Sequence, residues 1–373
     1  MKTQIYIKTP PHNWYQILAV SPHATLYQTE AWGNYIYSSK IGIPIYITCT
    51  YKEKVVGMML MWYEYLHHHI INRFPLIGSL ISVFREYNLK FGYLNNGPII
   101  LDNRFKNQIF KSLFKQVDKI AHRYRIISMT ILSDLALNCY KNCIQPEQNF
   151  IDQNFQSKQC STLILELSGL DESNFMSIFK SSTRKDINKS IRQNLSFSIL
   201  KLNELDQYHR LINENRQRIK SEYIIHMPTK VMLQNLALIK GIISFKIIKN
   251  NKIIAAMSLF CFNGISYQIA SCQSNQSYYE KWNVNDLLVW GAINWAIKNQ
   301  IKIYDLTGIP VYPTTKKEEG LLRYKKKWSD NRIDYFTYTK HFNKTFFYFL
   351  NLIKNMYNKN RQSVYLTKRT NIQ

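Results

Sequence analysis

Acidic residues are scarce in this chain of 373 residues. Asp and Glu together number 24 against 49 Lys and Arg, which gives a formal net charge of +25. A genome biased towards Ile, Asn, Lys and Tyr would not by itself remove Asp and Glu. We therefore interpret the depletion as selected, and it indicates a polyanionic partner: RNA, an anionic membrane face or a phosphorylated substrate. A basic surface that serves only solubility is the alternative.

Disulfide motifs and long apolar runs are also absent from the sequence. The six cysteines include no C-x-x-C pair, and the opening stretch MKTQIYIKTPPHNWYQ has no apolar core of a signal peptide. A membrane span needs about 18–20 apolar residues, and the best run, IINRFPLIGSLISVF, contains Arg73 and Pro75. We expect a cytoplasmic protein without a transmembrane segment, which contacts a membrane at most as a peripheral protein at its inner face.

The sequence does contain enough apolar residues for packed cores. Hydrophobic residues make up 46% of the chain and aromatic residues 14%, and the length suits about two domains. Residues 45–63 and 244–262 share the pattern of a strand, a polar turn and a second strand. Later in each half, a helical pattern at residues 107–124 or 283–300 leads directly into another strand.

This order predicts an α+β fold of two similar units, residues 1–158 and 159–340, each a mixed and mostly antiparallel sheet flanked by helices. Residues 341–373 form a separate tail. It places Phe342, Phe346 and Leu350 near one helical face among several lysines. A basic amphipathic helix of this kind lies on an anionic membrane or packs against its own domain, and the pattern leaves both open.

Three motifs in the second half resemble the C-terminal signature of the FemAB-like transferases. They are the helix start N-D-L-L at residues 285–288, the strand end Y-D-x-x-G at residues 304–308, and the segment G-L-x-x-Y-K-x-x-W at residues 320–328. Two other stretches are similar to family motifs: YQTEAW at residues 27–32, and STRKDINKSIRQNLSFSI, which begins at Ser182. Together the matches are spread over most of residues 25–340.

The resemblance implies two tandem domains of the GNAT acetyltransferase type and acyl transfer to an amine. In the best-known members the donor is an aminoacyl-tRNA and the acceptor is an amine of a peptidoglycan precursor stem peptide. Other relatives are acyl-CoA transferases that act on envelope polysaccharides. Either donor is a co-substrate, so no tightly bound cofactor is expected.

Scarce glycine bears on the choice of donor. Ordinary acetyltransferases of this fold hold the CoA pyrophosphate on a glycine-rich turn at a helix N-terminus, where backbone N–H groups are exposed. This chain has 12 glycines, and no two of them are in a G-x-G spacing. The missing turn and the charge of +25 favour a bulky polyanion such as tRNA as the donor.

The resemblance assigns donor binding and catalysis to one segment. Tyr324 and Lys325 match the family's F-K pair, which lies near the 3′ end of the donor, and Arg323 and Lys326 flank them. A lysine at this place stabilises a phosphate or the oxyanion of a tetrahedral intermediate. The alternative is a solvated basic helix face, to which Lys327 also belongs.

Asp305, at the end of the strand in the second motif, is the second catalytic candidate. Its carboxylate would orient the acceptor amine or take its proton. The alternative is a carboxylate that closes a turn with Thr307 and Gly308.

Basic residues at a helix start form a candidate site for an acceptor or a phosphate. Arg184, Lys185 and Asn188 lie at the start of a helix, where positive charge opposes the helix dipole and a bound anion would relieve the conflict. A merely solvated face is the alternative. Arg218 falls near the position of a family arginine that contacts the acceptor, with Arg216 as the other candidate.

Metal and nucleophile chemistry are not expected. Three consecutive histidines, His67 to His69, would point to opposite faces of a strand and cannot converge on one ion. No nucleophile motif is recognisable, which agrees with direct transfer. Three hypotheses follow: an aminoacyltransferase that uses tRNA and acts on an envelope precursor, an acyl-CoA-dependent transferase that acts on an amino sugar or polysaccharide, and a non-catalytic RNA- or membrane-binding descendant.

Overall fold

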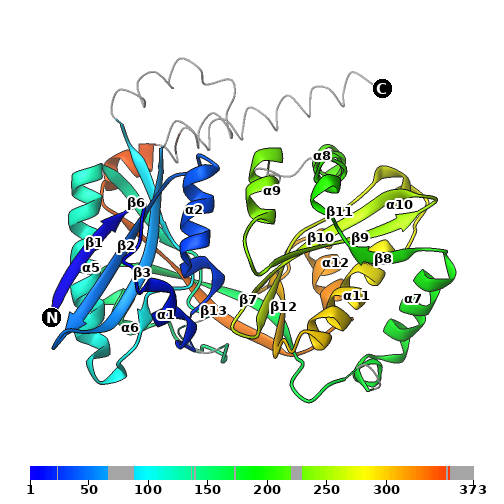
Figure 1. The fold of residues 1–373 in the computed structure, drawn as a ribbon, viewed down its shortest axis with the longest axis horizontal. Coiled ribbons are helices and arrows are strands. Elements are labelled where there is room, and N and C mark those ends of the chain that lie inside the picture. Colours follow the sequence, from blue (N-terminus) through cyan, green and yellow to red (C-terminus); the bar gives the residue numbers. More distant parts are fainter. Residues whose placement is uncertain are drawn as a thin grey trace.

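The structure, a computed structural model, describes residues 1–22, 24–65, 88–135, 137, 140–171, 174–219, 229–349 and 352. Figure 1 shows two lobes side by side, joined by strands that run between them. The first lobe contains β1 (Lys2–Ile7), α1 (Trp14–Ala19), α2 (Glu30–Ser38), β2 (Ile43–Tyr51), β3 (Lys54–Tyr65), β4 (Lys90–Leu94), β5 (Ile99–Ile100), α5 (Lys106–Tyr124), β6 (Ile126–Ile131) and α6 (Gln148–Ile151).

The second part of the chain follows the same scheme. It contains β7 (Gln156–Glu166), α7 (Ser181–Arg192), β8 (Ser196–Ile199), α8 (Leu205–Ile219), α9 (Lys230–Ala237), β9 (Ile242–Lys249), β10 (Lys252–Phe262), β11 (Ile265–Gln273), α10 (Asn275–Tyr279), α11 (Val284–Lys298), β12 (Ile303–Ile309), α12 (Lys316–Lys325) and β13 (Arg332–His341). The predicted α+β fold is confirmed.

Both predicted hairpins are present. β2 pairs with β3 and β9 pairs with β10, each in antiparallel register. At the second turn, Asn250 and Asn251 have φ angles of 48° and 60°, the pair of positive values that a type I′ turn needs and that asparagine tolerates. The first turn adopts the same geometry at Lys52 and Glu53, so its conformation is set by the flanking strands and not by favourable turn residues.

One continuous sheet runs through both lobes. The strand order is β1-β2-β3-β4-β6-β13-β7-β12-β11-β10-β9-β8, with β5 paired to β3. β13 pairs with β6 through residues 338–341 and with β7 through residues 332–339. The predicted domain boundary at residue 158 falls inside β7, and β13, in the interior of the strand order, contributes to both lobes.

Three large apolar clusters hold the lobes together. One packs α5 against the first half of the sheet and includes Phe336 and Tyr338 from β13, and a second packs α11 and α7 against the other half. The third lies between the lobes and joins Trp32 of α2 to Phe260 of β10 and Tyr267 of β11. Trp32, in the stretch YQTEAW that is similar to a family motif, is therefore a core residue.

The pairing of β11 with β12 determines where the site lies. The two strands are parallel neighbours over only three residue pairs, the last of which joins Tyr267 to Asp305. Beyond this pair the two strands continue without pairing to each other, β11 to Gln273 and β12 to Ile309. β4 and β6 form the corresponding parallel pair of the first lobe.

Some expectations concern residues outside the described part of the chain. The three histidines at 67–69 and most of the tail, residues 341–373, belong there. Where the structure does describe helices, none has the length and hydropathy that a bilayer crossing requires.

Candidate active site

Asp305 lies at the last parallel pair of β11 and β12 and is almost completely buried, with 2% of its surface exposed. Its Oδ1 accepts a hydrogen bond from the Thr162 hydroxyl of β7 and a second from the Thr307 backbone N–H at 2.6 Å. The bond to the N–H two residues ahead is the bond of an Asx turn. Burial raises the pKa of Asp305 to about 6, although both hydrogen bonds and the Lys325 charge act to lower it.

The backbone next to Asp305 is strained. Thr307 has a φ of 62°, a left-handed conformation that β-branched residues rarely adopt. Between Asp305 and Gly308 the register with β7 shifts at a β-bulge, a device that redirects backbone groups and is common beside active sites. The bulge turns the carbonyl oxygens of Thr307 and Gly308 towards α12, where both are bound by Lys325.

Lys325 is the last residue of α12 and is half-buried. Its Nζ donates to the Thr307 carbonyl at 2.9 Å and to the Gly308 carbonyl at 2.8 Å, and lies 3.5 Å from the Thr307 hydroxyl. Burial lowers the pKa of Lys325 to about 8, while the Asp305 carboxylate acts to raise it. The two catalytic candidates are therefore brought together, joined through Thr307.

The helix that carries Lys325 has a clear local origin. Thr315 accepts a hydrogen bond from the Glu318 N–H at 3.2 Å, and the Glu318 carboxylate accepts from the Thr315 N–H at 3.2 Å. This is the capping box that the spacing T-x-x-E favours. The ten residues that follow place Lys325 at the end of α12 facing β12.

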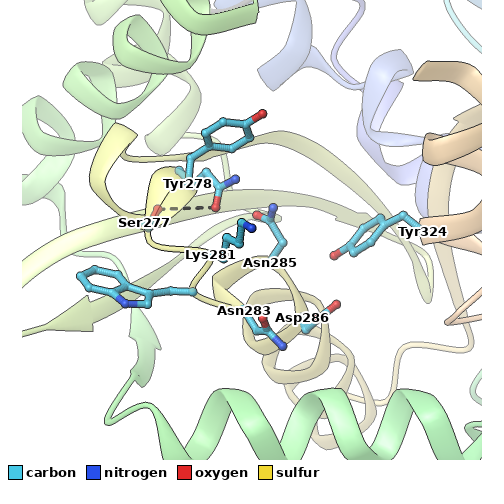
Figure 2. Close-up of a pocket in the computed structure, with 9 residues that line it drawn as sticks. Ser277, Tyr278, Lys281, Asn283, Asn285, Asp286 and Tyr324 are labelled. Atoms are coloured by element: carbon cyan, nitrogen blue, oxygen red, sulfur yellow. Dashed lines mark hydrogen bonds between the residues drawn. The ribbon is translucent and has the colours of Figure 1, made fainter. Parts of the chain in front are cut away.

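A cavity of about 230 Å³ lies at the N-terminus of α11 and is lined by Tyr324. In Figure 2 the ring of Tyr278 lies above Lys281 and Asn285, and the ring of Tyr324 lies to their right. Asp286, in the first turn of α11, also lines the cavity, and its carboxylate is bound by Lys327 at 2.9 Å. The helix N-terminus therefore already faces an anionic group of the protein itself.

Arg323 and Lys326 lie on a different surface from Tyr324. They line a second cavity, of about 390 Å³, together with Lys180, Ser182 and Thr183 from the region where α7 begins. Both basic side chains are exposed. The predicted donor-binding residues are thus divided between two cavities, with Lys327 lining the second and reaching Asp286 of the first.

The predicted phosphate-binding residues of α7 are not in this cavity. The Arg184 guanidinium donates to the Phe179 carbonyl at 2.6 Å, a contact within its own segment. Lys185 and Asn188 are exposed on α7. The residues of this region that line the cavity are Lys180, Ser182 and Thr183; the last two fall in the matched stretch but were not predicted as site residues.

Arg218 is engaged by the protein itself. Its guanidinium donates to Asn275 at 2.8 Å and to Asn215 at 2.6 Å, and it lies 4.5 Å from the centre of the Tyr278 ring. This cation–π contact fixes a ring that lines the first cavity. Arg218 therefore lies beside that cavity and positions its wall.

Two residues that matter for the geometry were not predicted from the sequence. Thr162 binds Asp305 from 143 positions away in the chain. Lys327 joins Asp186 of α7 to Asp286 of α11, with N–O distances of 2.7 and 2.9 Å. No local sequence pattern predicts such contacts. For Lys327 there was one indirect signal: Asp286, in the N-D-L-L motif, is one of few acidic residues in a basic chain, which favours a basic partner.

Among the described residues, no group of His, Cys, Asp and Glu side chains has the arrangement of a metal site.

Comparison with known proteins gives structural and not sequence matches. No protein-family model matches the chain, and no curated protein matches it. FemX shares 11% sequence identity at a TM-score of 0.66, over 94% of this chain and 99% of FemX. L-PGS from Bacillus licheniformis shares 10% at 0.53, over 94% and 98% of the two chains. A tandem GNAT protein from the clavulanic acid biosynthesis pathway shares 8% at 0.53, over 91% and 98%. The chain therefore has the tandem GNAT fold of FemX, which confirms at the level of the fold the resemblance to the FemAB-like transferases.

Proposed function

We propose that the protein is an N-acyltransferase that moves an aminoacyl group from aminoacyl-tRNA to an amine of a cell-envelope precursor, such as a peptidoglycan stem peptide. The observation that carries this proposal is the position of Lys325. Its ammonium group is held by two backbone carbonyls at the point where β11 and β12 stop pairing. A fixed positive charge at a strand end suits a reaction that develops negative charge on an acyl oxygen.

The reaction needs positioning more than covalent chemistry. The acceptor nitrogen attacks the ester carbonyl carbon, the C–N bond forms, the ester C–O bond breaks, and the ribose hydroxyl leaves with a proton. Lys325 has three N–H donors, of which two bind the carbonyls of Thr307 and Gly308. The third lies 3.5 Å from the Thr307 hydroxyl, the longest of the three contacts, and it is the one we assign to the oxyanion. With a pKa lowered by burial to about 8, Lys325 is mostly protonated at neutral pH, as this role requires.

The choice of tRNA over acyl-CoA is supported by the N-terminus of α11. A CoA pyrophosphate at this place would meet the Asp286 carboxylate, and the ten residues between β11 and α11 include no glycine. The net charge of +25 favours a large polyanion. We propose that the exposed Arg323 and Lys326 contact the phosphate backbone of the donor. The reaction would take place in the cytoplasm, with the basic tail near the inner face of the membrane.

The acyl-CoA hypothesis remains the second candidate, because one cavity would also accept its nucleotide. The cavity at the α11 N-terminus is lined by Lys281 and by the aromatic rings of Tyr278 and Tyr324, a combination that suits a nucleotide of either donor. In this second candidate function the acceptor is an amino sugar or an envelope polysaccharide. Because both donors end in an adenine nucleotide, the aromatic rings and Lys281 do not separate them, and only Asp286 and the missing glycines disfavour CoA.

Transfer from labelled donors tests the proposal directly. Purified protein and envelope precursors are incubated in parallel with ¹⁴C-aminoacyl-tRNA, with and without ribonuclease, and with ¹⁴C-acetyl-CoA. We expect ribonuclease-sensitive incorporation into the precursor fraction. Incorporation from acetyl-CoA alone would replace the first function by the second, and none from either donor would favour the non-catalytic descendant.

A pair of lysine variants tests the role of Lys325. Lys325→Ala should lower kcat/KM by about 10²–10³-fold, the range for loss of one oxyanion donor. Lys252→Ala, an exposed lysine at the start of β10, is the matched control and should leave the rate unchanged. Equal rates for both variants would remove Lys325 from the mechanism.

A further inference from the structure

We propose that Asp305 is a positioning residue that acts through the backbone of Thr307 on Lys325, and not the base that takes the proton of the acceptor amine. The proposal rests on the function given above, because it takes Lys325 as the group next to the reacting atoms. It concerns the contacts that position Lys325 and keep its amino group protonated.

The surroundings of Asp305 leave little room for a substrate amine. Only 2% of its surface is exposed, and Oδ1 accepts two hydrogen bonds, from the Thr162 hydroxyl on β7 and from the Thr307 N–H. A general base must come within hydrogen-bond reach of the proton that it removes. The Asp305 carboxylate is instead bound to the two strands that enclose it, β7 and β12.

Thr307 shows what this carboxylate does. A β-branched residue at a φ of 62° is strained and persists only where its surroundings hold it. The bond from the Thr307 N–H to Asp305, at 2.6 Å, is the contact that holds it. Because the carbonyl of the same residue binds Lys325, Asp305 sets the orientation of the group that receives the ammonium.

The carboxylate also acts on the charge of Lys325. Burial lowers the pKa of the lysine to about 8, and without the neighbouring carboxylate it would be lower still. The other titratable groups that interact with Asp305 are tyrosines whose pKa values burial raises, so they remain neutral near pH 7. They are Tyr27 before α2, Tyr140, Tyr267 of β11, Tyr304 of β12 and Tyr335 of β13.

The test follows the ionisation of Lys325 in the full-length protein by NMR, with lysine labelled with ¹³C at Cε. The Lys325→Arg variant identifies the signal. Asp305→Asn keeps an oxygen for the Thr307 N–H but removes the charge, so the pKa of Lys325 should fall by about half a unit or more. An unchanged pKa in this variant would overturn the proposal. The readout needs no substrate, so it stands even if no donor supports transfer.

Thr162→Val is the second variant, and it retains the test if Asp305→Asn does not fold. In the unmodified protein the Lys325 signal should inflect near pH 8 for its own proton and again near pH 6 for Asp305. Loss of the Thr162 hydroxyl removes a bond to the charged carboxylate, so the lower inflection should move up and the upper one should stay. A signal with one inflection in both proteins would contradict the coupling.

Kinetics separate the two roles once transfer is established. If Asp305 acts through Lys325, Asp305→Asn lowers kcat about tenfold and moves the alkaline limb of the pH profile to lower pH. In the Lys325→Ala protein, the same substitution causes no further loss of kcat. If Asp305 is the base, Asp305→Asn lowers kcat by about 10²–10⁴-fold, both in the unmodified protein and in the Lys325→Ala variant. The second pattern would overturn the proposal without affecting the transferase function. The reverse case, no transfer at all but a coupled Lys325, would reject the function alone.

Discussion

At the scale of single residues, the ionised carboxylate of Asp305 lowers the stability of the folded protein, because folding buries its charge. Burial raises the pKa of Asp305 from 3.8 to about 6. The folded state therefore binds this proton more tightly than the unfolded state, and folding becomes less favourable as the pH rises from about 4 to 6. Two pKa units correspond to a cost of at most about 3 kcal/mol above pH 6.

The Asp305→Asn variant should consequently be more stable than the unmodified protein. At pH 7 its free energy of unfolding should be higher by about 1–3 kcal/mol, and near pH 4 the difference should vanish. Denaturant unfolding at the two pH values measures this. Asp330→Asn, which removes an exposed carboxylate paired with Lys180, is the control and should change stability by less than about 1 kcal/mol. A stabilisation by Asp305→Asn that is equal at both pH values would contradict the account.

At the scale of elements, two helical glycines should respond to alanine in opposite ways. A Cβ on Gly291 of α11 would lie 2.4–2.6 Å from three ring atoms of Phe197 on β8. The ring would have to move, at about 1–3 kcal/mol. A Cβ on Gly320 of α12 meets no atom within 4 Å, so Gly320→Ala should gain about 0.5–1 kcal/mol from helix propensity. Thermal unfolding of the two variants tests this, because the unfolding temperature should fall for Gly291→Ala and rise for Gly320→Ala. Shifts of the same sign in both variants would refute the packing argument.

Local chemistry explains which elements could be predicted from the sequence. Three features depend only on neighbours in the chain: the hairpin at Asn250 and Asn251, the apolar repeat of α11 and the capping box at Thr315. Pattern and spacing were therefore sufficient to predict these elements. Lys325 and Asp305 were also predicted, because they fall in motifs. The bond from Thr162 to Asp305 and the contact of Arg184 with Phe179 depend on how strands and turns meet, and no spacing expresses that.

At the scale of the whole molecule, the internal repeat predicted two units but not how they share strands. β13 pairs with β6 of the first lobe on one side and with β7 on the other, and it takes Phe336 and Tyr338 into the core of the first lobe. These pairings join residues more than 150 positions apart, such as Cys160 and Tyr335. Sequence periodicity does not report contacts over that range. The repeat alone therefore predicted a division at residue 158, which lies inside β7.

This sharing predicts that the lobes do not fold as separate domains. The fragment 159–340 loses the first residues of β7, which pair with residues 337–339 of β13, and all of β6, which pairs with residues 338–341. It would expose a long unpaired strand edge and the two aromatic side chains of β13, features that promote aggregation. The full chain should unfold in one transition that is the same by circular dichroism and by tryptophan fluorescence, whereas the fragment should show no cooperative transition. A fragment that unfolds cooperatively would mean that the shared strands join two independent domains, and Lys325 could then be studied in the second lobe alone.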